Sequence, residues 1–125
     1  MIEHSVRPIR EPGFTAEVTQ SGRSITLRMT GNADMAVMAS LGNFLLSLHA
    51  AALKAKVSEV RVELRELYFM NSSCLRHLVT WLSAVEGLPR EEQYRLVFVS
   101  NPNLRWQARS LEALKHFAEA LVVIT

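Results

Sequence analysis

The chain has 125 residues, 49% of them hydrophobic and 21% charged, which is enough apolar material for one core in a single domain. Its 14 basic and 12 acidic residues nearly balance and no block of lysines and arginines occurs, which argues against a nucleic-acid partner. One cysteine excludes an internal disulfide, and the charged N-terminus lacks the apolar run of a secretory signal. We therefore expect a cytoplasmic protein.

The chain is expected to begin with a lead-in and a β-hairpin. Residues 1–13 predict a flexible lead-in that ends in a Pro-Gly turn, and residues 14–125 predict the single domain. Residues 14–19 and 24–30 have the composition of two strands, and Ser21-Gly22 between them predicts a tight turn. The first two strands should therefore pair antiparallel.

A long helix follows, and its charge-free stretch must be weighed against a membrane span. Residues 35–56 predict the helix, with Asp34 as its N-cap. No Asp, Glu, Lys or Arg occurs from Met35 to Leu53, which is close to bilayer-spanning length. The stretch keeps a helical apolar stripe but is interrupted by polar side chains, namely Ser40, Asn43, Ser47 and His49. We expect a helix mostly buried in the domain and no membrane span.

The second half of the chain alternates strands with helices. The expected elements are a strand at 57–64, a helix from Ser72 to near Gly87, a strand at 94–99, a helix at 104–117 and a strand at 120–124. This order predicts an α/β fold with a mixed, mostly parallel sheet of about five strands, opened by an antiparallel hairpin and packed against helices. Alternation within residues 57–64 favours one well-buried sheet face and one partly exposed face.

The most informative stretch is the corner at which a strand runs into the helix. Asn71, Ser72 and Ser73 are good N-cap residues, because their side-chain oxygens accept hydrogen bonds from the free amides of a first helical turn. A phosphoryl group there would add about −1.5 to −2 charges. The helix terminus would tolerate that charge, whereas a contact surface around it would be weakened. Arg76, one turn later, could pair with the phosphate.

Three short motifs occur in order along the chain. They are Thr30-Gly31-Asn32-Ala33-Asp34 after the second strand, Phe69-Met70-Asn71-Ser72-Ser73-Cys74-Leu75 at the corner, and Asn101-Pro102-Asn103-Leu104-Arg105 before the last helix. Together they resemble the signatures of the STAS domain, the module of anti-sigma-factor antagonists and of sulfate-transporter tails. The family corner reads Phe-Met-Asp-Ser-Ser-Gly-Leu, so Asn71 and Cys74 are departures. The resemblance covers the chain from about Phe14 onward and implies the STAS fold.

The resemblance also implies a bacterial regulatory binding module that takes part in partner switching and transcription regulation, and not an enzyme. In bacterial members the first serine of the corner motif, here Ser72, is phosphorylated by a partner kinase that also serves as an anti-sigma factor or a related switch protein. The unphosphorylated domain binds the partner and the phosphorylated one releases it. The implied partner surface consists of Asn32, Asp34, Asn71, Ser72, Ser73 and Arg76. A phosphatase and a second copy of the chain are further candidate partners, and no cofactor is implied.

Two other functions stay open from the residues. One is a scaffold subunit that assembles constitutively in a signalling complex, without phosphorylation. The other is a thiol enzyme that uses Cys74 at the helix N-terminus with His77 nearby, although a small apolar role for Cys74 is favoured. The four histidines show no ligand spacing, so no metal site is expected. Trp81 and Trp106 are predicted with equal weight as interface anchors or as side chains at the core margin.

Overall fold

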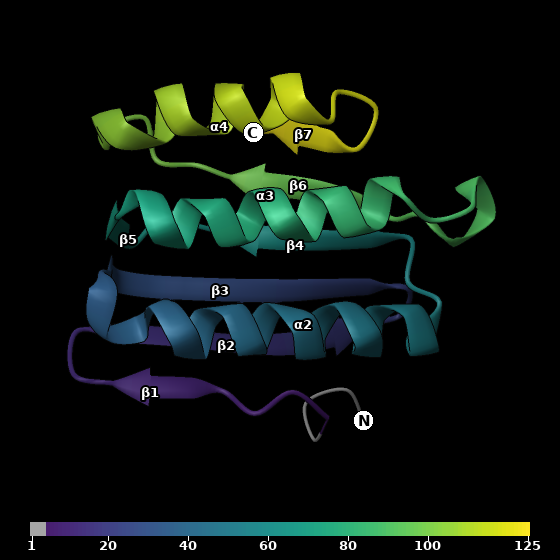
Figure 1. Ribbon diagram of the computed structural model, residues 1–125, viewed down its shortest axis with the longest axis horizontal. Helices are drawn as coiled ribbons and strands as arrows, with labels where there is room; N and C mark the ends of the chain where they lie inside the picture. Colours follow the sequence, from purple (N-terminus) through teal and green to yellow (C-terminus); the bar gives the residue numbers. More distant parts are fainter. Residues whose placement is uncertain (1–4) are drawn as a thin grey trace.

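Seven strands form one sheet in the part of the chain that the computed structural model describes, residues 5–125 (Figure 1). Their order is β1-β2-β3-β4-β6-β7, and β5 pairs with β3 beyond the end of β4. The strands are β1 (Ile9–Glu11), β2 (Phe14–Ser21), β3 (Ser24–Ala33), β4 (Glu59–Glu63), β5 (Leu67–Met70), β6 (Arg95–Val99) and β7 (Val122–Ile124). β1, β2 and β3 pair antiparallel and every later pairing is parallel, which confirms the predicted mixed sheet.

The estimate of about five strands was too low, because two segments were misjudged. The lead-in is not loose over residues 9–11, where β1 pairs with β2 and places Ile9 opposite Ala16. Val6 and Ile9 are buried in the core, and this burial gives the segment a reason to be ordered. Residues 1–4 of the expected lead-in lie outside the described residues. The second extra strand is β5, which a turn at residues 64–67 separates from β4.

The opening hairpin turn lies one residue later than expected. Ser21 pairs with Ser24, so the two residues in the turn are Gly22 and Arg23. Gly22 has a φ of +59°, a left-handed conformation that glycine adopts without strain.

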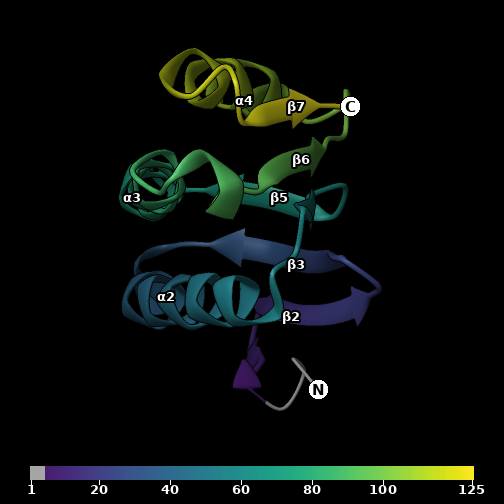
Figure 2. The same ribbon diagram turned by 90° about the vertical axis from the view of Figure 1, so that its right-hand side faces the viewer.

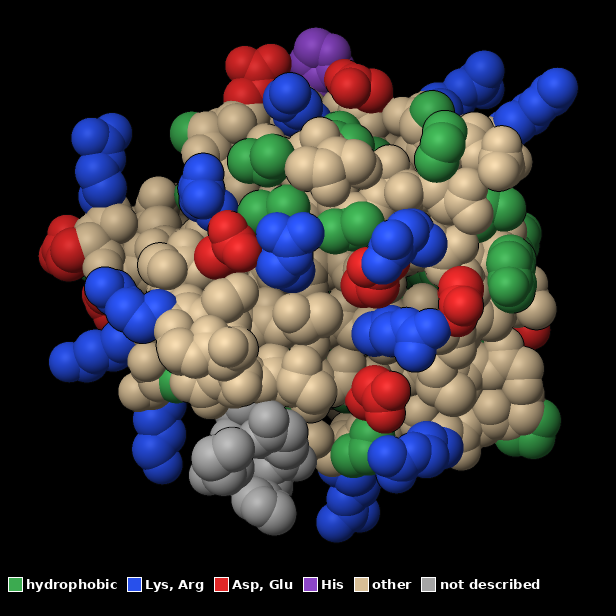
Figure 3. Space-filling view, turned by 180° about the vertical axis from the view of Figure 1, so that it is seen from behind, with side chains coloured by type: hydrophobic (Ala, Val, Ile, Leu, Met, Phe, Trp, Pro, Cys, Tyr) green, Lys and Arg blue, Asp and Glu red, His purple; other side chains and the backbone are tan. Residues whose placement is uncertain are grey.

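Within residues 5–125, the helices α2, α3 and α4 lie on one face of the sheet (Figures 1 and 2). Their bounds are α2 (Met38–Ala55), α3 (Ser72–Glu86) and α4 (Arg105–Phe117). Two short 3₁₀ turns also occur: η1 (Met35–Val37) precedes α2, and η2 (Arg90–Glu92) precedes β6. α2 and α3 run side by side across the middle of the sheet, and α4 lies beside β6 and β7. The opposite face carries charged side chains of both signs (Figure 3), paired for example as Arg28–Glu66 and Arg65–Glu63. The prediction of one buried and one exposed face is confirmed.

α2 is less buried than predicted. The segment Met35–Ala55 is long and apolar enough to cross a membrane by length and composition alone, and core helices of soluble domains pass the same test. Only 33% of that segment's most apolar window is buried, because α2 turns one stripe to the sheet and the other to solvent. Leu41, Leu45 and Leu48 are in the core, whereas Leu46 is 66% exposed. The helix therefore presents an outer surface without charged side chains up to Lys54 in its last turn.

Both tryptophans belong to the core or its margin. Trp81 is buried, and its Nε1 donates a hydrogen bond to the hydroxyl of buried Tyr94 at 2.7 Å. Trp106 is half-buried, and its Nε1 lies 3.3 Å from the carbonyl oxygen of Leu67. Neither tryptophan is exposed enough to anchor an interface by itself.

Candidate partner-binding site

The corner between β5 and α3 has a capped helix start with a free serine beside it. Asn71 is the N-cap in extended conformation, and its Oδ1 accepts a hydrogen bond from the amide of Cys74 at 2.8 Å. The prediction that Asn71 is a cap is confirmed. Ser72, expected to share that role, is instead the first residue of α3, is exposed, and has no side-chain hydrogen bond to the described residues. Its hydroxyl is therefore available to solvent or to another molecule.

The end of β3 lies directly beside this corner. The amide of Asn71 donates to the carbonyl of Ala33 at 2.9 Å, and Asn32 is opposite Phe69 in the parallel β3–β5 pairing. Asp34 caps the η1 turn as predicted, because its Oδ1 accepts from the amide of Ala36 at 3.0 Å. Two segments about forty residues apart in sequence thus meet at one sheet edge.

The six residues predicted for the partner surface come from these two segments and from the first turns of α3. Asn32, Asp34, Ser72 and Arg76 are exposed, and Asn71 and Ser73 are half-buried. Arg76 forms no ion pair within residues 5–125, and it lies four residues after Ser72 on the same side of the helix. The corner therefore combines free amides, a free hydroxyl and an unpaired guanidinium.

Three exposed apolar side chains flank the corner, and the sequence analysis did not single them out. Met35 is 64% exposed, Tyr68 57% and Phe69 46%. Tyr68-Phe69 lies between the strand predicted at 57–64 and the helix predicted from Ser72, and no pattern in the sequence predicted either ring on the surface. Within residues 5–125, β5 pairs only with β3, the pairing shifts register between Gly31 and Asn32, and both rings stay exposed. Exposed apolar groups gathered in this way are typical of protein-interaction sites.

The thiol and the imidazole near the corner have structural contacts. Cys74 is fully buried, and its Sγ donates to the carbonyl of Asp34 at 3.6 Å. Burial, and secondarily the Asp34 carboxylate, raise the pKa of the Cys74 thiol, which disfavours the nucleophilic thiolate. His77 is 2.9 Å, through Nε2, from the carbonyl of Met38 and is not a base for Cys74. Within residues 5–125, no group of three or more His, Cys, Asp or Glu side chains could hold a metal ion.

A mixed sheet with helices on one face and a polar corner before α3 defines the STAS-like class of α/β folds. No protein-family model matches the sequence, and no curated protein is similar to it. Solved structures of anti-sigma factor antagonists are similar to this chain, which confirms at the level of the fold the resemblance drawn from the motifs.

Two of these structures are particularly informative. An anti-sigma factor antagonist from Mycobacterium paratuberculosis is 17% identical, with a TM-score of 0.60 over 86% of each chain. The anti-sigma factor antagonist SpoIIAA in its unphosphorylated form is 15% identical, with a TM-score of 0.52 over 88% of this chain and 86% of that one.

Proposed function

We propose that this protein is a non-enzymatic, cytoplasmic regulatory module that binds a protein partner through the β5–α3 corner and is switched by phosphorylation of Ser72. The observation that carries the proposal is the exposed Ser72 hydroxyl, which the Asn71 cap leaves free. The exposed Met35, Tyr68 and Phe69 side chains supply apolar area for a partner to cover. The partner class is a serine kinase of the anti-sigma type, with a phosphatase to reset the switch.

The fold can carry a phosphate at Ser72 at little cost. The first amides of α3 and the positive end of its dipole favour an anion, and Arg76 lies within one turn. Asn71 is neutral, so no carboxylate repels the phosphate from the capping position. The domain therefore need not change its fold when Ser72 is modified.

The same charge would be costly inside a contact surface. Phe69 is three residues before Ser72, so a partner that covers the end of β5 and the start of α3 would also cover Ser72. A phosphate of about −1.5 to −2 charges would then be desolvated or would meet acidic partner groups, and the complex would weaken. The fold is shared with anti-sigma factor antagonists, one of which is described in its unphosphorylated form, and this similarity favours such a switch.

The test uses two variants of Ser72 and one charge control. An ATP-dependent serine kinase of the anti-sigma type should label Ser72, as mapped by mass spectrometry. Ser72→Ala should bind that kinase like the unmodified chain, and Ser72→Asp should bind at least about tenfold more weakly by calorimetry. Ser83→Asp, on an exposed position of α3, should leave the affinity unchanged. Labelling elsewhere, or equal weakening by both aspartates, contradicts the proposal.

A scaffold subunit is the second candidate function. The exposed Met35, Tyr68 and Phe69 could be covered permanently by a partner or by a second copy, without any phosphate. In that case Ser72→Ala and Ser72→Asp bind equally well, and Tyr68→Ser removes binding in both backgrounds. Sedimentation of the chain alone separates a second copy from a different partner.

A further inference from the structure

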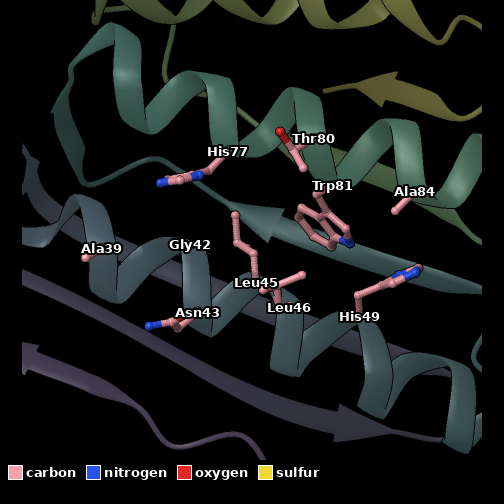
Figure 4. Close-up of a pocket in the computed structure, with 10 residues that line it drawn as sticks. All are labelled: Ala39, Gly42, Asn43, Leu45, Leu46, His49, His77, Thr80, Trp81 and Ala84. Atoms are coloured by element: carbon pink, nitrogen blue, oxygen red, sulfur yellow. The ribbon is translucent and has the colours of Figure 1, made fainter.

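A groove lies between α2 and α3 on the helical face (Figure 4). Its volume is about 340 Å³, within the range of about 300–1,000 Å³ usual for small-molecule sites. Leu45 and Leu46 of α2 line one side, and Thr80, Trp81 and Ala84 of α3 line the other. The groove is separate from the Ser72 hydroxyl and from the proposed phosphorylation.

Among residues 5–125, no Asp, Glu, Lys or Arg lines the groove. α2 has none of these residues before Lys54, and Leu46 stands 66% exposed beside the groove. A charged ligand would lose its hydration here without gaining a counter-charge, and this loss is costly. The lining therefore selects a neutral, mainly apolar molecule.

A hydrogen-bond relay at one end of the groove determines which nitrogen of His49 carries the proton. Trp81 Nε1 can only donate, so the Tyr94 hydroxyl oxygen accepts from it at 2.7 Å. Among residues 5–125 the hydroxyl proton of Tyr94 has no other hydrogen-bond acceptor than His49 Nδ1, 2.6 Å away, so we infer that Tyr94 donates to it. Burial lowers the pKa of His49 and favours its neutral ring, and burial raises the pKa of Tyr94, which keeps the phenol protonated. The neutral His49 ring thus carries its hydrogen on Nε2, a donor.

His77, at the other end of the groove, offers a hydrogen-bond acceptor, whereas His49 offers a donor. His77 Nε2 lies 2.9 Å from the carbonyl of Met38, and because a carbonyl only accepts, Nε2 is the donor. In the neutral ring Nδ1 is left as an acceptor. The His77 ring packs over Gly42, where an added Cβ would come within 2.9 Å of the ring. Figure 4 shows His77 and His49 near opposite ends of the groove, with Leu45 and Trp81 between them.

We propose that the α2–α3 groove binds a small neutral ligand with an aromatic or aliphatic ring body and one polar group, such as a hydroxyl, that can donate and accept hydrogen bonds. The apolar walls hold the body, and His49 Nε2–H or His77 Nδ1 holds the polar group. An apolar cleft with a few polar groups in fixed roles is the usual form of a ligand site.

The experiment follows the tryptophan indole N–H signals of the ¹⁵N-labelled chain by NMR while 1-naphthol is added. Trp106→Phe assigns the remaining indole signal to Trp81. The Trp81 signal should shift and saturate with a Kd on the order of 1 mM, as expected for a fragment of this size. Naphthalene, which lacks the hydroxyl, should bind more weakly. Anionic 1-naphthoate should bind at least about tenfold more weakly than 1-naphthol.

Matched variants locate the binding. Ala84→Leu fills the groove from an exposed helical position and should raise the Kd for 1-naphthol at least about tenfold. Ala113→Leu makes the same change on the exposed side of α4, outside the groove, and should leave the Kd unchanged. Gly42→Ala displaces the His77 ring and should remove most of the preference for 1-naphthol over naphthalene. The same spectra report whether each variant is folded.

Several results would overturn the proposal. They are a Trp81 signal that does not saturate, equal Kd values for 1-naphthol and 1-naphthoate, or the same Kd in Ala84→Leu and the unmodified chain. If Ala84→Leu instead weakens binding of the Ser72 kinase partner, the groove is a protein docking surface. If it dissociates a dimer in sedimentation, the occupant is a second copy of the chain.

Discussion

Gln107 joins the last helix to the turn between β4 and β5, and replacing it tests how the corner is held. Gln107 is fully buried on α4. Its Nε2 donates to the carbonyls of Leu64 at 2.7 Å and Leu67 at 3.1 Å, and its Oε1 accepts from the amide of Asn101 at 2.7 Å. The two bonds to Leu64 and Leu67 hold the turn from which β5 and the Ser72 corner start, and the third ties Gln107 to the segment that follows β6.

We expect Gln107→Leu to lower the free energy of unfolding by about 2–4 kcal/mol. Each lost hydrogen bond costs about 1 kcal/mol, and the backbone amide of Asn101 is left without its acceptor. Burying the apolar leucine in place of a polar side chain offsets part of this cost. Leu64 and Leu67 each keep another donor, from the amide of Leu67 and from Trp106, so their carbonyls add little to the cost.

The assay is urea unfolding followed by circular dichroism, with Gln93→Leu as a matched control. Gln93 also donates to two carbonyls, those of Glu86 and Leu88, but in more exposed surroundings. Gln93→Leu should therefore cost less than about 1 kcal/mol, because water can replace its hydrogen bonds. Equal costs for the two variants, or a cost below about 1 kcal/mol for Gln107→Leu, would refute the reasoning from burial.

Three further predictions concern the Asn71 cap, the half-buried His49 imidazole and a glycine. Asn71→Ala should cost about 1 kcal/mol in urea unfolding and Asn71→Asp little, because only alanine removes the cap to α3; equal costs would contradict the capping role. The pKa of His49 is lowered by burial from its usual value of about 6.5, so the unfolded chain binds the proton more tightly. The contribution of His49 to the free energy of unfolding should be fully present above pH 6.5. It should decline as the pH falls toward the pKa that His49 has in the folded protein. The unfolding midpoint of His49→Gln should decline less over that window, and a parallel decline would contradict the assignment. Gly31→Ala should be clearly more destabilising in thermal unfolding than Gly22→Ala. Both glycines have positive φ, but only at position 31 would a Cβ overlap the backbone of Gly13, so similar melting temperatures would contradict this clash.

The local features of this protein were determined by sequence alone. Asn71 and Asp34 cap the turns that follow them because a cap depends on one side chain and the two or three amides after it. The alternation in residues 57–64 is local as well. It indicated one buried face because successive side chains of a strand point to opposite faces of the sheet, whichever strand lies next to it. The three motifs indicated the fold that similar solved structures share with this chain.

Features that depend on distant segments were decided only by the tertiary structure. The exposure of Tyr68 and Phe69 depends on the turn after β4 and on the pairing of β5 with β3. No pattern in residues 67–70 predicts that pairing. The ordering of residues 9–11 depends on the free edge of β2. The groove needs His49, His77 and Trp81 from two helices, and their hydrogen-bonding roles are set by Tyr94 on a third segment. Sequence periodicity shows which side of an element is apolar, but the neighbours that cover that side come from packing.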